Sequence, residues 1–178
     1  MKLGLFMNSW HLPETLAADA YDIDLDLIVR AEELGYEEAL FSEHFTSLWA
    51  KLPAPDILIA AALQRTTRIR LGTGVNNLPY HHPAMLAHRI ATLDHLARGR
   101  LIWGIGSGGL PGDMELFQID LAGGEQRGVT RDVVDAVLKV WEHARDGAST
   151  GQSWDTPHWK MTLPKVKYQW RRKKGDSR

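Results

Sequence analysis

Short apolar segments alternate with longer amphipathic segments along most of the chain. The strand-like segments cover residues 3–7, 38–42, 68–75 and 101–105, and the helix-like segments cover residues 22–34, 57–64, 83–96 and 124–144. Strands that are each followed by a helix predict a parallel sheet with right-handed crossovers. Such an α/β fold is either a doubly wound open sheet or part of a (β/α)8 barrel, and periodicity does not choose between them.

Local signals mark the ends of the expected helices. Gly35 and Gly99 act as stop signals, and Pro83 fits the first turn of the third helix. Asp56 is a suitable N-cap for the helix over residues 57–64. A complete barrel needs about 250 residues, so this chain of 178 residues is too short to form one.

The composition is that of a globular protein with no overall attraction for polyanions. Hydrophobic residues make up 44% of the chain, charged residues make up 24%, and the formal net charge is −1. The absence of cysteine excludes disulfides, thiolate metal ligands and cysteine nucleophiles. No apolar run reaches the roughly 18 residues of a membrane span, and the start of the chain has no signal-peptide pattern. We expect a cytoplasmic protein that binds neither nucleic acid nor a membrane.

Basic residues are concentrated at the end of the chain. Residues 165–178 contain seven lysines and arginines against one aspartate. A short basic terminus can bind nucleic acid or a membrane, but an unstructured end is the simpler interpretation. We therefore predict one domain over residues 1–164, followed by a disordered or frameshifted tail.

A polar cluster follows the second expected strand. The segment Ser42-Glu43-His44-Phe45-Thr46 places a carboxylate, an imidazole and two hydroxyls at the carboxyl end of that strand. Ligands bind at this end of the strands in α/β folds. His44 is therefore a candidate acid, base or hydrogen-bond donor.

Glycine-rich junctions follow the third and fourth expected strands. The third junction runs from Gly72 to Pro83, and its glycines permit close approach to a flat ligand. Adjacent residues in an extended loop point to opposite sides, so His81 and His82 are poor partners for one ion. We predict no metal site.

The fourth junction matches G-x-G-x-x-G at residues 104–109. This match does not fit a dinucleotide fingerprint, because it follows the fourth strand and because Pro111-Gly112 is expected to interrupt the helix that should come next. A glycine-lined backbone with Ser107 remains, which could present N–H groups to a phosphate or a planar ring.

Three segments together resemble the bacterial luciferase-like flavin-dependent monooxygenases of the alkanal or terpene type. Ser42-Glu43-His44-Phe45 is similar to the family's E-H-H-F or S-E-H-F segment. Residues 71–83 resemble its G-T-x-x…L-P…H-P junction, and residues 94–108 resemble its L-D-x-L-S-x-G-R…G-x-G-x-G segment. The resemblance implies a (β/α)8 TIM barrel of which this chain holds about the first four βα units.

The resemblance also implies roles for individual residues. His44 matches the active-site histidine beside the reactive edge of the flavin. Gly74 and Val75 match a junction that packs against the isoalloxazine ring, often through a non-proline cis peptide, and Asn76 would face the same pocket. Gly106 and Ser107 match the glycine-rich cofactor segment, with Ser107 in place of an arginine that helps hold the phosphate.

The implied activity is oxidation of a small organic substrate by O2 with reduced FMN, which a separate reductase can supply. Relatives that use coenzyme F420 leave an F420-dependent oxidoreductase as an alternative, and a non-catalytic half-barrel fragment is another. Full-length relatives pair through the helices after strands two and three, so a homodimer is expected. The second half of the barrel, which supplies much of the phosphate site, is missing from this sequence.

Overall fold

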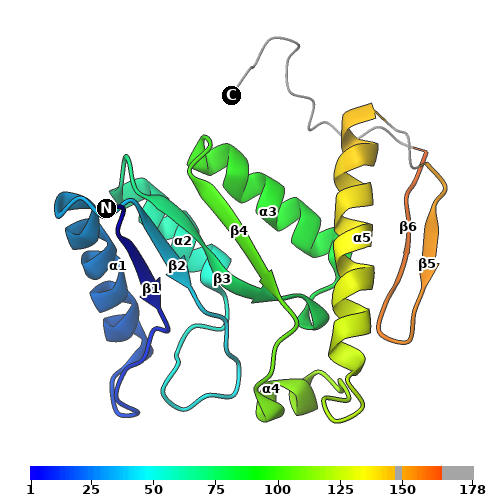
Figure 1. Ribbon diagram of the computed structural model, residues 1–178, viewed down its shortest axis with the longest axis horizontal. Helices are drawn as coiled ribbons and strands as arrows, with labels where there is room; N and C mark the ends of the chain where they lie inside the picture. The colour runs from blue at the N-terminus through cyan, green and yellow to red at the C-terminus, as the bar shows by residue number, and fades with distance from the viewer. Residues whose placement is uncertain (147–149, 166–178) are drawn as a thin grey trace.

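The computed structural model describes residues 1–146 and 150–165 of the protein. Four parallel strands form one sheet in the order β1-β2-β3-β4 (Figure 1). They are β1 (Gly4–Met7), β2 (Glu38–Phe41), β3 (Arg70–Asn77) and β4 (Leu101–Gly106). Each strand pairs with the next one along the chain. A doubly wound sheet would reverse this order at its switch point, so the sheet is part of a (β/α) barrel.

The expected helices follow the four strands with modest changes in their ends. They are α1 (Ala17–Glu33), α2 (Pro55–Arg65), α3 (Pro83–Ala97) and α5 (Glu125–Asp146). Helix α1 begins earlier than expected because its first turn is mostly exposed and carries no apolar stripe to reveal it. The prediction that Asp56 caps α2 was wrong. Ala54 is the N-cap, and Asp56 lies in the first turn after Pro55.

Four small elements escaped the sequence prediction. The 3-10 helix η1 (Leu78–Tyr80) follows β3, and the antiparallel hairpin β5 (Ser153–Asp155) and β6 (Lys160–Thr162) lies beside α5 (Figure 1). Helix α4 (Pro111–Leu116) begins where an interruption was expected. Proline lacks only an N–H that the first helical turn does not use, so Pro111 starts this helix instead of ending it.

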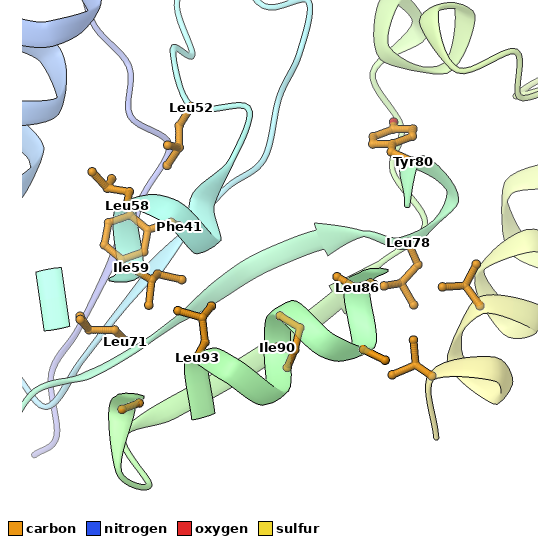
Figure 2. Packing of buried hydrophobic residues seen from close by; sticks show 14 of the residues in the cluster. Phe41, Leu52, Leu58, Ile59, Leu71, Leu78, Tyr80, Leu86, Ile90 and Leu93 are labelled. Atoms are coloured by element: carbon orange, nitrogen blue, oxygen red, sulfur yellow. The ribbon is translucent and has the colours of Figure 1, made fainter. Parts of the chain in front are cut away.

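The main core lies between the sheet and its helices. Ala39, Phe41 and Leu71 point from the strands toward the helices and are almost fully buried. Figure 2 shows Phe41 and Leu71 gathered with Ile59 of α2 and Leu93 of α3. Burying a side chain of this size contributes about 1.5–3 kcal/mol, so this layer holds the strands in register.

The opposite face of the sheet carries Phe6, Leu40 and Gly74. A Cβ on Gly74 would lie 2.9 Å from Leu40 Cβ and 3.0 Å from Phe6 Cε2, which places all three residues on one side. Phe6 is 60% exposed there. This face is the inner wall of the partial barrel, because the helices cover the other side.

None of the helices in the described ranges is long and apolar enough to cross a membrane. The basic segment expected to form a tail lies outside the described residues from position 166 onward. The division between residues 1–164 and 165–178 therefore stays a prediction.

Candidate functional site

The carboxyl ends of the four strands bring the expected site residues to one edge of the sheet. His44 follows β2, and Asn76 ends β3 together with Asn77. Gly106 ends β4 and pairs with Asn77 across the ladder, and Ser107 comes next. Parallel strands end on the same side, so segments from distant parts of the sequence meet here.

Glu43 ties the ends of β2 and β3 together. Its side chain is almost fully buried and accepts hydrogen bonds from the Asn77 backbone N–H at 2.7 Å and from Asn76 Nδ2 at 3.2 Å. His81 Nε2 lies 2.9 Å from Glu43 Oε1, and Asn77 Nδ2 donates to the Glu43 carbonyl at 2.9 Å. These contacts satisfy the buried carboxylate, as a buried charge requires.

Asn76 is not placed as expected. Its side chain is 1% exposed, donates through Nδ2 to Glu43 and accepts through Oδ1 from Trp103 Nε1 at 3.1 Å. Both ends of the amide are therefore committed to neighbouring strands. Asn76 shapes the edge of the sheet through Glu43, and its side chain does not face an open pocket.

His44 lies beside Asp113, a residue that the sequence reasoning missed. The His44 side chain is 30% exposed, and its Nδ1 is 3.5 Å from Asp113 Oδ2. Asp113 Oδ1 accepts from the Phe45 N–H at 3.1 Å and from both the N–H and the Oγ1 of Thr46 at 2.7 Å. The only sequence signal for Asp113 was an acidic residue in the first turn of the unexpected helix α4.

Val75 and the glycines of β4 form a closely packed part of the inner wall. The peptide bond between Gly74 and Val75 is cis. A Cβ on Gly106 would lie 2.4 Å from Val75 Cγ2, and a Cβ on Gly104 would lie 2.1 Å from the Thr73 carbonyl oxygen. Only glycine allows β3 and β4 to approach this closely.

An aromatic cluster lies near the carboxylates of Asp113 and Glu43. Tyr80 stacks on Phe117 with ring centroids 4.7 Å apart, and Phe45 meets Tyr80 edge-on at 5.7 Å. Burial, together with the negative charges of Asp113 and Glu43, raises the pKa of the Tyr80 hydroxyl to about 12. The hydroxyl is therefore neutral and can donate a hydrogen bond at ordinary pH.

Gly108 is required beside this cluster. Its φ is +74°, and a Cβ there would lie 2.5 Å from Tyr80 Oη and 2.7 Å from Met114 Cε. The glycine-rich segment after β4 therefore packs directly against the aromatic cluster, which a larger residue at position 108 would prevent.

Several buried polar atoms at this edge have no hydrogen-bond partner among the described residues. They are Ser9 Oγ, Ser42 Oγ, His44 Nδ1, Tyr80 Oη and Asp113 Oδ2. Buried polar atoms are normally satisfied, so a cluster of exceptions is typical of a site that binds a polar ligand or water. The glycine-walled inner face next to them suits a flat ligand.

The two adjacent histidines point apart, as expected. His81 contacts Glu43, whereas His82 caps α3 by accepting from the Ala84 N–H at 3.3 Å. Within residues 1–146 and 150–165, no group of three His, Asp or Glu side chains could hold a metal ion.

A large hollow lies away from these residues. It has a volume of about 670 Å³ and lies between α3, β4 and α5, with Ile90, Trp103 and Trp141 in its lining. Trp103 packs edge-on against Trp141 at 5.2 Å. This hollow is on the helix-facing side of β4, so its volume says nothing about the inner wall near His44.

The family profile described as "Luciferase-like monooxygenase" matches residues 1–167. The chain belongs to this family. The match covers both glycine junctions, His44 and Asp113, and it confirms the resemblance inferred from the three sequence segments.

Curated members of the luciferase-like monooxygenase family share extensive identity with this chain. A 4-hydroxyprotoasukamycin monooxygenase of Streptomyces nodosus subsp. asukaensis is 45% identical over 117 residues, which are 66% of this chain and 31% of that protein. Limonene 1,2-monooxygenase of Rhodococcus erythropolis is 43% identical over 117 residues, 66% of this chain and 30% of that protein. 2,5-Diketocamphane 1,2-monooxygenase 1 of Pseudomonas putida is 33% identical over 141 residues, 79% of this chain and 39% of that protein.

Solved structures of monooxygenases have the same fold. The oxygenating constituent of 3,6-diketocamphane monooxygenase of Pseudomonas putida, a type II Baeyer-Villiger enzyme in complex with FMN, has a TM-score of 0.83 at 27% identity. The alignment covers 92% of this chain and 44% of that one. Monooxygenase RslO1 of Streptomyces bottropensis has a TM-score of 0.78 at 29% identity, covering 97% of this chain and 51% of that one. The matched region thus spans between about a third and a half of these proteins.

Proposed function

We propose that this chain forms the flavin-facing half of a monooxygenase site that uses reduced FMN and O2 to oxidise a small organic substrate. The observation that supports this most directly is the position of His44 beside a glycine-walled inner face at the carboxyl edge of a barrel sheet. The FMN in the 3,6-diketocamphane enzyme, whose fold this chain shares, is the second support.

The residues at this edge fit a flavin. Gly74, Val75 and Gly106 form a flat, closely packed wall suited to an aromatic ring system. Ser107 follows Gly106 and offers a hydroxyl and an N–H to the phosphate. A phosphate held there without an arginine at position 107 has fewer charge-assisted hydrogen bonds, so we expect weaker FMN binding.

The protein's part in the reaction is to bind, orient and exclude water. Bound reduced FMN supplies the electrons for activation of dioxygen. His44 exposes part of its ring at the wall and moves a proton to or from the reacting groups. Asn76 acts indirectly, because its amide holds Glu43 and Trp103 in place.

FMN titration of the 178-residue chain tests this proposal. We expect saturable quenching of flavin fluorescence by the wild type. Gly106→Val should weaken FMN binding more than tenfold, because its side chain collides with Val75. Gly109→Ala is the matched control, since a Cβ there meets nothing within 4 Å. Absence of saturable binding to oxidised or reduced FMN would overturn the proposal for this chain.

The same titration separates the alternatives. Saturable binding of F420 without binding of FMN would assign the chain to F420-dependent chemistry. Binding of neither cofactor by a folded chain would favour a non-catalytic half-barrel. A second assay tests the substrate class. It measures product formation from limonene and from 2,5-diketocamphane, the compounds in the relatives' names. The assay contains O2 and reduced FMN, which a flavin reductase supplies.

We also propose a homodimer formed through α2 and α3. Ile57 of α2 and Met85 of α3 are 64% and 63% exposed, although both side chains are large and apolar. Exposed apolar side chains on neighbouring helices are typical of an interface. In sedimentation velocity, Ile57→Asp and Met85→Asp should shift the dimer to monomer. Leu116→Asp on α4 is the control, and an intact dimer in both test variants would contradict this interface.

A further inference from the structure

We propose that Asp113 is the positioning residue of His44, holding the imidazole in the tautomer that carries its proton on Nδ1. This role rests on the proposed function in one respect, because that function supplies the reaction in which His44 takes part. The contacts of the Asp113 carboxylate join α4 to the segment after β2 and support this role.

Asp113 is clamped against the residues that follow His44. Its Oδ1 accepts three hydrogen bonds, from the Phe45 N–H and from the N–H and Oγ1 of Thr46. The residue is fully buried. These bonds fix the plane of the carboxylate, so the direction of Oδ2 is fixed as well.

The second oxygen of Asp113 faces His44. Oδ2 and His44 Nδ1 lie 3.5 Å apart, and neither atom has a hydrogen-bond partner among the described residues. A buried carboxylate oxygen without a donor is costly. Catalytic hydrogen bonds are often long in ligand-free sites and tighten when a ligand binds. Nδ1–H is the donor that this oxygen lacks.

A proton held on Nδ1 of His44 determines the role of the other ring nitrogen, Nε2. A neutral imidazole has one donor and one acceptor nitrogen. His44 Nδ1 is buried, whereas the side chain is 30% exposed, so the exposure lies on other atoms of the side chain. With the proton fixed on Nδ1, Nε2 is the nitrogen that can accept a proton.

The neighbouring pair of Glu43 and His81 provides an internal contrast. His81 Nε2 lies 2.9 Å from Glu43 Oε1, but the Glu43 carboxylate also accepts from Asn76 and Asn77. The Glu43 carboxylate therefore accepts hydrogen bonds from the end of β3 in addition to its contact with His81. Glu43→Gln should change the environment of His81 and leave the tautomer of His44 unchanged.

Nitrogen-15 NMR of histidine-labelled protein at about pH 8, well above the ordinary imidazole pKa of ~6.5, tests the proposal. The wild type should show His44 protonated on Nδ1. Asp113→Asn keeps an oxygen for Phe45 and Thr46 but turns an NH2 group toward Nδ1, so the proton should move to Nε2. Thr46→Val removes one bond of the clamp and should retain the wild-type tautomer.

A wild-type His44 protonated on Nε2, or an unchanged tautomer in Asp113→Asn, would overturn the proposal. The wild-type spectrum alone is decisive if Asp113→Asn does not fold. FMN titration of the same samples keeps the two proposals apart. A tautomer shift without FMN binding would support the role of Asp113 and contradict the proposed function.

Discussion

At the amino edge of the sheet the polar groups are paired, whereas at the carboxyl edge several buried atoms lack partners among the described residues. Arg100, just before β4, donates to the carbonyls of Leu63, Thr66 and Ile69 and to Thr66 Oγ1, at 3.0–3.4 Å. At the carboxyl edge, Ser42 Oγ and Tyr80 Oη are buried without such partners.

Glu32 gives the amino edge a second clamp. Its carboxylate accepts from the backbone N–H groups of Thr67, Arg68 and Ile69, which lead into β3. Partial burial raises the pKa of this carboxyl, but the three hydrogen bonds outweigh it and leave the pKa below its usual value. The stabilisation is therefore present above about pH 4.5 and is lost as the pH falls through the lowered pKa.

The contrast fits a division between stability and the proposed site within one sheet. In barrel folds the amino face serves stability and the carboxyl face serves catalysis. Here the difference is visible in hydrogen bonding, since the amino-edge clamps close loops and the carboxyl edge leaves polar atoms available to a ligand. Substitutions at the two edges should therefore have separable effects.

The largest expected effect is on activity at the carboxyl edge. His44→Asn should lower the rate of product formation in the reduced-FMN assay of the proposed function by about 10²–10⁴-fold, the usual contribution of a general acid or base. The midpoint of urea unfolding should change little. His82→Asn is the control, because asparagine can also cap α3. Equal loss of activity in both variants would show that His44 has no specific role at the carboxyl edge.

The next effect is on stability at the amino edge. Arg100→Met removes a charged donor from three carbonyls and should lower the free energy of unfolding by about 3 kcal/mol. Urea denaturation measures this loss, and FMN affinity of the folded variant should be unchanged. Arg70→Met, which removes a half-exposed ion pair with Glu38, should cost less than about 1 kcal/mol. A weakened FMN affinity in Arg100→Met would break the separation between the edges.

The smallest expected effect is a gain in stability at the carboxyl edge. Tyr80→Phe removes a buried hydroxyl without a partner among the described residues and should raise the free energy of unfolding by about 1 kcal/mol. In Tyr21→Phe, by contrast, the lost hydroxyl donates to the Lys51 carbonyl at 2.8 Å, so a loss is expected. Urea titrations at neutral pH compare the two, and destabilised Tyr80→Phe would mean that the hydroxyl is satisfied.

Tyr80→Phe should also change the pH dependence of the free energy of unfolding. An unfolded tyrosine ionises near pH ~10, whereas the pKa of Tyr80 is raised to about 12. The part of the free energy of unfolding that depends on a neutral Tyr80 phenol is fully present below about pH 10. It is lost as the pH rises through about 12. Tyr80→Phe should remove this part of the alkaline loss, measured by unfolding at several pH values.

Much of the fold was predictable because its signals are local. Apolar periodicity placed the four parallel strands and their helices, and Gly35 and Gly99 both adopt positive φ where helices were expected to stop. Helix α4 was missed because it is short and starts at a proline. Hairpin β5–β6 was missed because its strands are only three residues long.

The site was predictable only in part. Resemblance drew attention to His44 and to the glycine junctions, but not to how side chains pair across strands. Asn76 was expected at the pocket and instead bridges Glu43 and Trp103. Polar side chains on neighbouring strands can form hydrogen bonds with the same partners. Which pairs form depends on the directions of the side chains, and the spacing of residues along the sequence does not specify these directions.

The sequence by itself determined the order of strands and helices along the chain and the edge at which a ligand is expected, because hydrophobic periodicity and strand direction are properties of short segments. Only the tertiary structure decided that Asp113 lies beside His44 and that Tyr80 lies near two carboxylates. Those partners come from segments far apart in the chain. They meet because parallel strands end at a common edge, where burial and hydrogen-bond geometry choose which groups pair.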